Sequence, residues 1–280
     1  MALFVLLWSS GAIASRMGLD HGSPLAFLTL RYGIALAVVS VIAYSNGNLL
    51  LPRTEWLRVA VVGLLINGLY AICYLFALEH GITPGILTTI LGVQPVITVA
   101  LTEKRVKGQR AAGLALAFAG LVLALSPSVT LEGATIIAVG FALTALASMA
   151  AGAILQQRET LSPIQVMPLQ YIVGLAACSV VAPFQPFWFS WSVDFLLPLL
   201  WMAIVISVAA TLLFYRMIQT SNLVNTTSVF YLVPIVTAIL DLLLLGNMMA
   251  LTGMLGMALI VFGIIFIFRS TPVLRRSDGD

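Results

Sequence analysis

Long apolar segments alternate with short polar turns along the whole chain. Each segment holds about twenty residues, enough for a helix to cross the hydrocarbon core of a bilayer at a rise of about 1.5 Å per residue. Polar and apolar residues do not alternate within the segments, as they would in the strands of a membrane β-barrel. The pattern therefore predicts an all-α membrane protein with ten transmembrane helices, over residues 2–19, 24–45, 56–78, 84–102, 109–126, 133–155, 163–182, 194–217, 223–245 and 250–268.

The composition supports this prediction and narrows the function. Hydrophobic residues make up 61% of the chain and charged residues only 8%, whereas a soluble domain has about 25% charged residues. The net charge of +3 is small, and nothing in its distribution indicates nucleic-acid binding. Cys73 and Cys178 both lie inside apolar segments, which is typical of packing residues and not of a disulfide or a metal site. We expect no cofactor and no metal.

Two distant stretches share their sequence pattern. Residues 83–102 and 222–241 are both mostly apolar, and Pro95 of the first falls on Pro234 of the second, 139 positions later. A second stretch repeats with the same offset: Ser23, Pro24, Leu30, Tyr32, Leu36 and Ala37 fall on Ser162, Pro163, Leu169, Tyr171, Leu175 and Ala176. Because two separate stretches share one offset, the chain is predicted to contain an internal duplication.

Glycines are also regularly spaced in the fifth and tenth predicted spans. Gly113 and Gly120 lie seven positions apart, as do Gly256 and Gly263. This spacing puts small residues on one face of each helix, which predicts close approach to a neighbouring helix.

The basic residues predict the orientation. If the amino terminus is cytoplasmic, all of the 13 Lys and Arg residues except Arg16 and Arg31 lie at the inner face, as the positive-inside rule requires. Each half then holds five spans, so the second half crosses the membrane inverted relative to the first. This predicts two inverted five-helix repeats, 1–127 and 128–268, around a central cavity, a cytoplasmic tail 269–280, and both termini inside. Inverted repeats are typical of secondary transporters, whose site lies near the membrane midplane.

The order and spacing of several motifs resemble the EamA branch of the drug/metabolite transporter superfamily. These motifs are Leu7-Trp8-Ser9-Ser10-Gly11, Pro24 followed by Arg31-Tyr32, and the spans with Pro95 and Pro234. Within that family the chain is most similar to YddG-type exporters of amino acids. The resemblance implies a bacterial-type inner membrane protein. It also implies a cavity lined by the first, third, fourth, sixth, eighth and ninth spans, with the fifth and tenth at the periphery.

The side chains expected to hold the cargo are uncharged polar and aromatic residues within the spans. No acidic residue falls at mid-membrane depth in the predicted topology, so a neutral or zwitterionic molecule would be held by hydroxyls, amides and ring faces. Tyr and Trp can instead be interfacial anchors, and Ser and Thr can bond to their own helix backbone. The predicted substrate-binding residues are Trp8, Ser9, Ser10, Asn67, Tyr70, Tyr74, Thr88, Gln94, Met149, Ser207, Thr211 and Tyr231.

Four further residues are predicted to break helices or to gate the cavity. Pro95 and Pro234 each remove a backbone hydrogen bond, and the freed carbonyls of Leu91 and Phe230 should then face protein or water. Arg31 either snorkels to the outer interface or pairs with Asp241 to brace an outer gate.

Together these features predict an alternating-access transporter that exports or exchanges amino acids, aromatic and other neutral ones included, and works as a monomer. The lack of an acidic residue at mid-membrane depth favours a facilitator or exchanger over a tightly proton-coupled carrier. Two alternatives stay open: a carrier of sugars, nucleosides or other small neutral metabolites, and a channel-like pore. An enzyme is disfavoured because the chain has neither H-E-x-x-H nor G-x-S-x-G.

Overall fold

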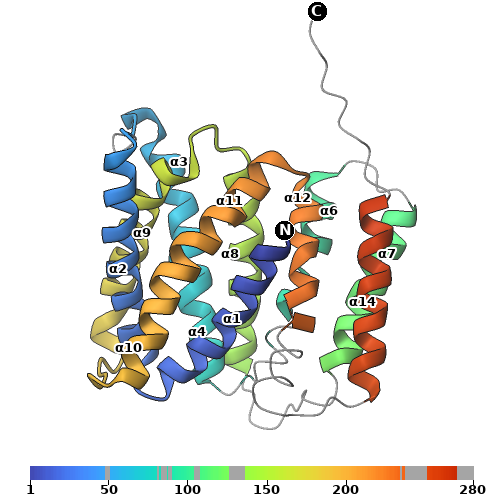
Figure 1. The fold of residues 1–280 in the computed structure, drawn as a ribbon, viewed down its shortest axis with the longest axis horizontal. Coiled ribbons are helices and arrows are strands. Elements are labelled where there is room, and N and C mark those ends of the chain that lie inside the picture. The colour runs from blue at the N-terminus through green and yellow to red at the C-terminus, as the bar shows by residue number, and fades with distance from the viewer. Residues whose placement is uncertain are drawn as a thin grey trace, which may run out of the picture.

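The computed structural model describes residues 1–47, 51–80, 82, 87, 90–103, 108–125, 136–233, 235–236 and 251–269. In this part of the chain the regular structure is helical, with one isolated bridge between Gly22 and Phe189. Seven of the described helices are long and apolar enough to cross a membrane. They stand roughly side by side in Figure 1, so the prediction of an all-α membrane protein is confirmed. The total of ten spans stays a prediction.

The longer helices agree closely with the predicted spans. They are α1 (Ala2–Leu19), α2 (Pro24–Ser45), α7 (Gly108–Leu125), α8 (Ile136–Gln157), α9 (Pro163–Val181) and α14 (Leu251–Arg269). Both α2 and α9 start at a proline that follows an extended serine. Proline is favoured in a first turn because the missing N–H would have no helical partner there.

Two spans are composite. The third consists of α3 (Trp56–Gly63), a π-helical segment Leu64–Tyr70 and α4 (Ala71–Glu79). The eighth consists of α10 (Val193–Leu200), a π-helical segment Trp201–Ala210 and α11 (Thr211–Thr220). The offset of 139 positions carries residues 64–70 onto 203–209, inside the second π-helical segment. π-Helical turns are uncommon and often occur at functional sites.

The fourth and ninth spans are described only in part. The fourth contributes α6 (Gln94–Thr102). The ninth contributes α12 (Leu223–Ser228), followed by a 3₁₀ turn, Val229–Leu232. Pro234, Asp241 and Thr88 lie outside the described residues.

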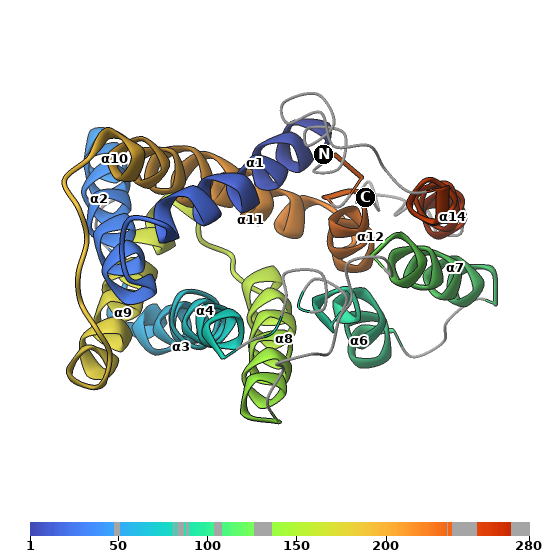
Figure 2. The same cartoon turned by 90° about the horizontal axis from the view of Figure 1, so that it is seen from below.

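The view from below shows how the helices are arranged. In Figure 2, α2, α9 and α10 lie at one end of the molecule, and α7 and α14 lie together at the other. The helices α1, α4, α6, α8, α11 and α12 surround the space between these two ends. The peripheral position of the fifth and tenth spans, which the family resemblance implied, is what the figure shows.

The glycines explain how closely α7 and α14 pack. A Cβ atom added to Gly113 would lie 2.8 Å from the carbonyl oxygen of Gly263, and one added to Gly120 would lie 2.6 Å from that of Gly256. The two helices are therefore in backbone contact along their length. They run antiparallel, because ascending positions on α7 meet descending positions on α14.

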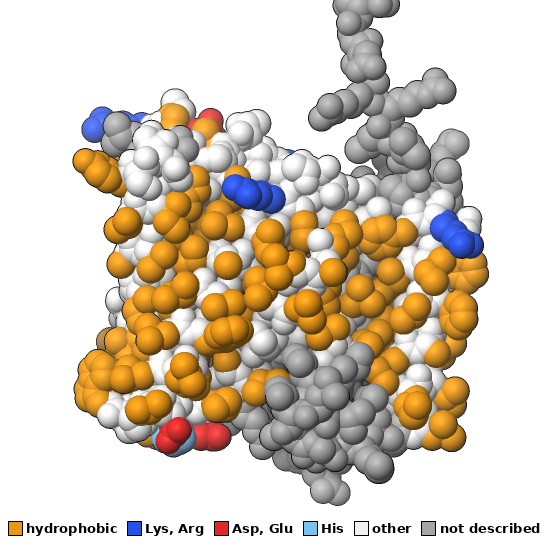
Figure 3. All heavy atoms as spheres, viewed as in Figure 1, with side chains coloured by type: hydrophobic (Ala, Val, Ile, Leu, Met, Phe, Trp, Pro, Cys, Tyr) orange, Lys and Arg blue, Asp and Glu red, His pale blue; other side chains and the backbone are white. Residues whose placement is uncertain are grey.

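The surface is that of a multi-pass membrane protein. Figure 3 shows hydrophobic side chains across the middle of one face, Lys and Arg near its upper edge, and Asp and Glu at both its upper and lower edges. Ile136 and Leu57 are 90% and 78% exposed, and in a bilayer such apolar side chains would contact lipid. We call the end of the molecule that holds Arg53, Arg58, Arg158, Arg216 and Arg269 the basic end.

Candidate functional site

A cavity of about 230 Å³ lies among the central helices. On α1 its lining runs from Trp8 to Leu19, the last residue of the helix, and on α2 from Phe27 to Tyr32, near the helix start. Because α1 ends and α2 begins opposite the basic end, the cavity extends toward that opposite end.

Aromatic rings pack on the other side of the cavity. Phe4, Trp8, Phe214 and Phe230 form a cluster that we call the aromatic floor, with ring centroids 5.3 to 6.1 Å apart. These residues come from α1, from α11 and from the 3₁₀ turn after α12. Phe4 and Phe214 are buried, and Phe4 lies toward the basic end from Trp8 along α1.

One wall of the cavity is an interrupted helix. Gly92 and Val93 form a turn, and α6 begins at Gln94 with Pro95 in its first turn. The helix is thus interrupted directly before Pro95, which lies in the first turn of the new helix, where it needs no N–H donor. Leu91, Gly92, Gln94 and Pro95 all line the cavity, so this irregular backbone faces a cavity and not lipid, as the bilayer requires.

Several polar groups on the lining have no protein partner. Asn67 and Gln94 are only 7% and 5% exposed. Among the described residues, no hydrogen-bond partner is found for the side chain of Asn67 or for the Nε2 of Gln94. The buried hydroxyls of Tyr215 and Tyr231 likewise have no partner in the described part of the chain. A buried polar group left unbonded costs about 1–3 kcal/mol, so these groups are the candidate partners for a polar ligand.

Arg31 is the one charged side chain among the described residues that line the cavity. Its Nε donates to the Oγ of Ser207, 2.7 Å away on the π-helical segment Trp201–Ala210. Its Cζ lies 5.7 Å from the centroid of the Tyr32 ring. No described acidic side chain forms an ion pair with it. The predicted partner, Asp241, lies outside the described residues.

Most of the predicted binding residues meet at this cavity. Those on its lining are Trp8, Asn67, Tyr70, Tyr74, Gln94, Met149, Thr211 and Tyr231, together with Pro95 and Arg31. Thr88 and Pro234 lie outside the described residues.

Three predicted serines point elsewhere. The Oγ of Ser9 donates to the Val233 carbonyl at 3.3 Å. The Oγ of Ser10 donates to the Leu7 carbonyl at 2.6 Å and accepts from Trp201. Ser207 is 1% exposed behind Arg31. A helical serine readily bonds to nearby backbone, so its presence in a span does not indicate which way it points.

The prediction missed residues from the second and seventh spans. Tyr32 and Tyr171 both line the cavity, with ring centroids 5.3 Å apart. They lie 139 positions apart in the sequence, so the repeat itself contained the signal that could have identified them. Phe214, Tyr215 and Phe230 were also missed as lining residues. They fall within predicted spans, where an aromatic residue alone does not distinguish a cavity from packing.

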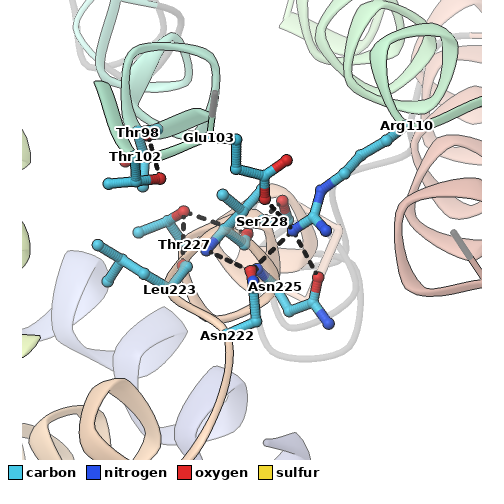
Figure 4. Close-up of polar contacts among 10 residues, drawn as sticks. Thr98, Thr102, Glu103, Arg110, Asn222, Leu223, Asn225, Thr227 and Ser228 are labelled. Atoms are coloured by element: carbon cyan, nitrogen blue, oxygen red, sulfur yellow. Dashed lines mark hydrogen bonds and ion pairs between the residues drawn. The ribbon is translucent and has the colours of Figure 1, made fainter. Parts of the chain in front are cut away.

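A polar cluster joins the helices at the basic end (Figure 4). Arg110, which is only 2% exposed, reaches from α7 to the start of α12. One of its terminal nitrogens lies 3.1 Å from Glu103 Oε1, 2.7 Å from Asn222 Oδ1 and 3.2 Å from Asn225 Oδ1. Asn222 also caps α12 by accepting from the backbone N–H groups of Val224 and Asn225. We call Glu103, Arg110, Asn222 and Asn225 the polar latch.

A second charged contact lies at the same end. The Nε of Arg58 is 2.8 Å from Glu159 Oε1, and the Arg58 guanidinium also donates to the Arg158 carbonyl. Burial raises the pKa of the Glu159 carboxyl, and Arg58 opposes that shift. The amide of Gln219 donates to the carbonyls of Glu159 and Leu161. These bonds tie α3, the turn before α9 and α11 together at the basic end.

Known proteins resemble this chain over most of its length. A family model described as the EamA-like transporter family matches residues 1–126 and 136–269. Over 192 residues the chain is 27% identical to the "Probable amino-acid metabolite efflux pump" of Salmonella typhimurium, covering 66% of this chain and 60% of that protein. It is 22% identical over 276 residues to the "Uncharacterized transporter YvbV" of Bacillus subtilis, covering 94% and 88%. A crystal structure of an 18% identical protein has the same fold, with a TM-score of 0.76 over 94% of each chain.

Proposed function

Since this chain belongs to the EamA-like transporter family, we propose that it exports or exchanges amino acids, aromatic and other neutral ones included, by alternating access across a bacterial-type inner membrane. Family membership makes it a transporter and not an enzyme. The observation that carries the proposal is the central cavity, which is lined by aromatic rings and by polar groups that have no partner among the described residues. Such a lining suits a compact molecule with both polar and apolar parts.

Two inverted halves would supply the alternation, and several observations support them. The family match falls into two stretches of similar length. The π-helical segments recur at the offset of 139 positions. The contact of Gly113 with Gly263 becomes that of Gly256 with Gly120 when the two halves are exchanged, at an offset of 143 positions here and not 139. A pseudo-two-fold relation of this kind lets the same set of helices close either end of the cavity.

The described conformation corresponds to closure at the cytoplasmic end, if the basic end is cytoplasmic as the positive-inside rule indicates. There the aromatic floor and the polar latch both connect the first half of the chain to the second. Opening this end requires Arg110 to separate from Asn222 and Asn225 and the four rings to part. Amino-acid cargo is supported by the printed name of the Salmonella relative.

Counterflow in proteoliposomes tests this function. Vesicles loaded with unlabelled phenylalanine should accumulate labelled phenylalanine, whereas vesicles with Tyr74→Ala should accumulate it several-fold more slowly. Empty liposomes and vesicles loaded with glucose provide the controls. If glucose or a nucleoside showed counterflow and no amino acid did, the amino-acid assignment would be rejected. The chain would still be a transporter of this family. Conductance without saturation would reject the carrier mechanism.

A further inference from the structure

We propose that the cavity recognises its cargo through a carboxylate held by Arg31, and that the cargo's amino group is dispensable. Monocarboxylates with an apolar body would then be cargo as well as amino acids. The inference rests on the proposed transport function and states which chemical group of the cargo the cavity recognises. The starting observation is that Arg31 carries a positive charge on the cavity lining. Among the described residues, no acidic side chain lines the cavity.

The side chain of Arg31 is held at the cavity and does not extend to the membrane surface. Arg31 lies seven residues into α2, about 10 Å from the helix start by helix rise. A snorkelling arginine would direct its head group along its own helix to the interface. Here the Nε is bonded instead to Ser207 on another span, 2.7 Å away. Ser207 is itself fixed, because the Tyr171 hydroxyl donates to its backbone carbonyl.

This anchoring leaves the binding edge of the guanidinium available. A guanidinium carries five N–H donors, and the described contacts of Arg31 occupy only the one on Nε. The two terminal nitrogens can form the paired hydrogen bonds that match a carboxylate. A cation at this depth in a membrane protein is costly without an anion, so an incoming carboxylate would be strongly favoured.

The neighbouring polar groups reinforce the preference for an anion. Asn67 packs beside Tyr32, since both lie against Gly174, and its amide has no described partner. Gln94 offers an unbonded Nε2, and Tyr215 and Tyr231 offer unbonded hydroxyls. All of these groups can donate a hydrogen bond. A carboxylate, which only accepts, is the ligand that such a set of donors suits.

The same lining offers little to an ammonium group. No described residue on it carries a negative charge. An ammonium would have only carbonyl oxygens and ring faces, and cation–π contacts contribute less than a charge pair. The amino group of an amino acid is therefore accommodated but not needed.

The aromatic floor would receive the apolar body of the cargo. Phe214 lies seven residues beyond Ser207 in the same span, which is about 10 Å by helix rise. A molecule whose carboxylate contacts Arg31 can therefore direct a side chain of benzyl size toward Trp8, Phe214 and Phe230. The carboxylate of the cargo would thus bind at Arg31 and its apolar body at the aromatic floor.

Competition against labelled phenylalanine counterflow tests the inference on the unaltered protein. Four probes share one benzyl body: phenylalanine, phenyllactate (a carboxylate without an amino group), phenylalaninamide and phenethylamine. Phenyllactate should inhibit at a concentration within about threefold of phenylalanine, and the two probes without a carboxylate should need at least tenfold more. Equal inhibition by phenylalaninamide, or no inhibition by phenyllactate, would overturn the inference. Absence of counterflow with every probe would instead reject the proposed transport function.

Variants of Arg31 test whether this residue is responsible for the preference for a carboxylate. Arg31→Gln should lose the discrimination between phenylalanine and phenylalaninamide, while Arg31→Lys should keep a reduced part of it because the charge remains. Arg216→Gln removes an exposed arginine at the basic end and should behave like the parent protein. Unchanged discrimination in Arg31→Gln protein that elutes as a monodisperse peak would contradict the assignment. The wild-type competition decides the inference if that variant does not fold.

Discussion

At the scale of single residues, the cavity is defined by side chains whose hydrogen-bonding groups are left unused by the fold. Gln94 is the clearest example, being 5% exposed with an unbonded Nε2 on the cavity lining. Its identity as a polar residue in an apolar span was visible in the sequence. A buried amide in a membrane needs a partner, but the sequence could not say whether that partner was another helix or a ligand.

We expect Gln94→Leu to reduce transport about tenfold and to leave stability nearly unchanged. A tenfold loss corresponds to about 1.4 kcal/mol, the size of one hydrogen bond to the cargo, and the Gln94 Nε2 makes no hydrogen bond to a described residue that could be lost. Initial counterflow rate and thermal unfolding in detergent measure the two effects. Gln109→Leu alters an exposed glutamine on α7 and should change neither. A large fall in melting temperature with intact transport would show that Gln94 is structural.

At the scale of elements, the positions of proline and glycine explain where a helix begins and which helices pack closely, which hydropathy does not. Pro95 marks where α6 begins, because a residue without an N–H is best placed in a first turn. Gly113, Gly120, Gly256 and Gly263 allow α7 and α14 to meet backbone to backbone. The sequence predicted the close-packing faces from glycine spacing. It did not predict that these two helices would be each other's partner.

The close contact between α7 and α14 at Gly120 predicts how a substitution there changes stability. A Cβ on Gly120 would meet backbone atoms of Gly256 and Ile260 at 2.6 and 2.7 Å, so Gly120→Ala should destabilise the protein by about 1–3 kcal/mol, as overpacking typically does. Gly140→Ala is the matched control in α8, since nothing lies within 4 Å of its added Cβ. That control should be neutral or stabilising by about 0.5–1 kcal/mol. Equal melting temperatures for the two variants would contradict the packing.

At the scale of the whole molecule, the polar latch and the aromatic floor lie at the basic end, which they would keep closed in the proposed alternation. The aromatic floor connects α1 to α11 and to the turn after α12. The polar latch connects the end of α6 and the start of α7 to the start of α12. Alternation between two open states is a population shift, and weakening contacts that exist in only one state favours the other. The latch is therefore the place where a mutation should change the conformational balance without touching the cavity.

Arg110→Gln should increase access from the basic end. A cysteine introduced at Leu223, which is 2% exposed beside the latch, reports that access when Cys73 and Cys178 are replaced by alanine. Labelling by an impermeant maleimide applied from the basic side should rise several-fold in Arg110→Gln and stay at its basal rate in Arg216→Gln. An unchanged labelling rate would show that the latch does not control this end.

The sequence by itself determined the properties that depend on neighbours along the chain. Segment length and hydropathy are sufficient to specify membrane helices, and motif order was sufficient to identify the family. The aromatic and amide residues expected at the cavity were also recognisable, because polar groups within long apolar spans are costly unless they have a partner.

Only the tertiary structure decided which way those residues point. Arg31 could have snorkelled outward, yet it crosses to Ser207, and the hydroxyls of Ser9 and Ser10 are bonded to backbone carbonyls. Tyr32 and Tyr171 come together although they lie far apart in the sequence. The rotation of a helix about its axis depends on the helices packed around it. This rotation is therefore determined by contacts between distant segments and cannot be read from the local sequence pattern of one segment.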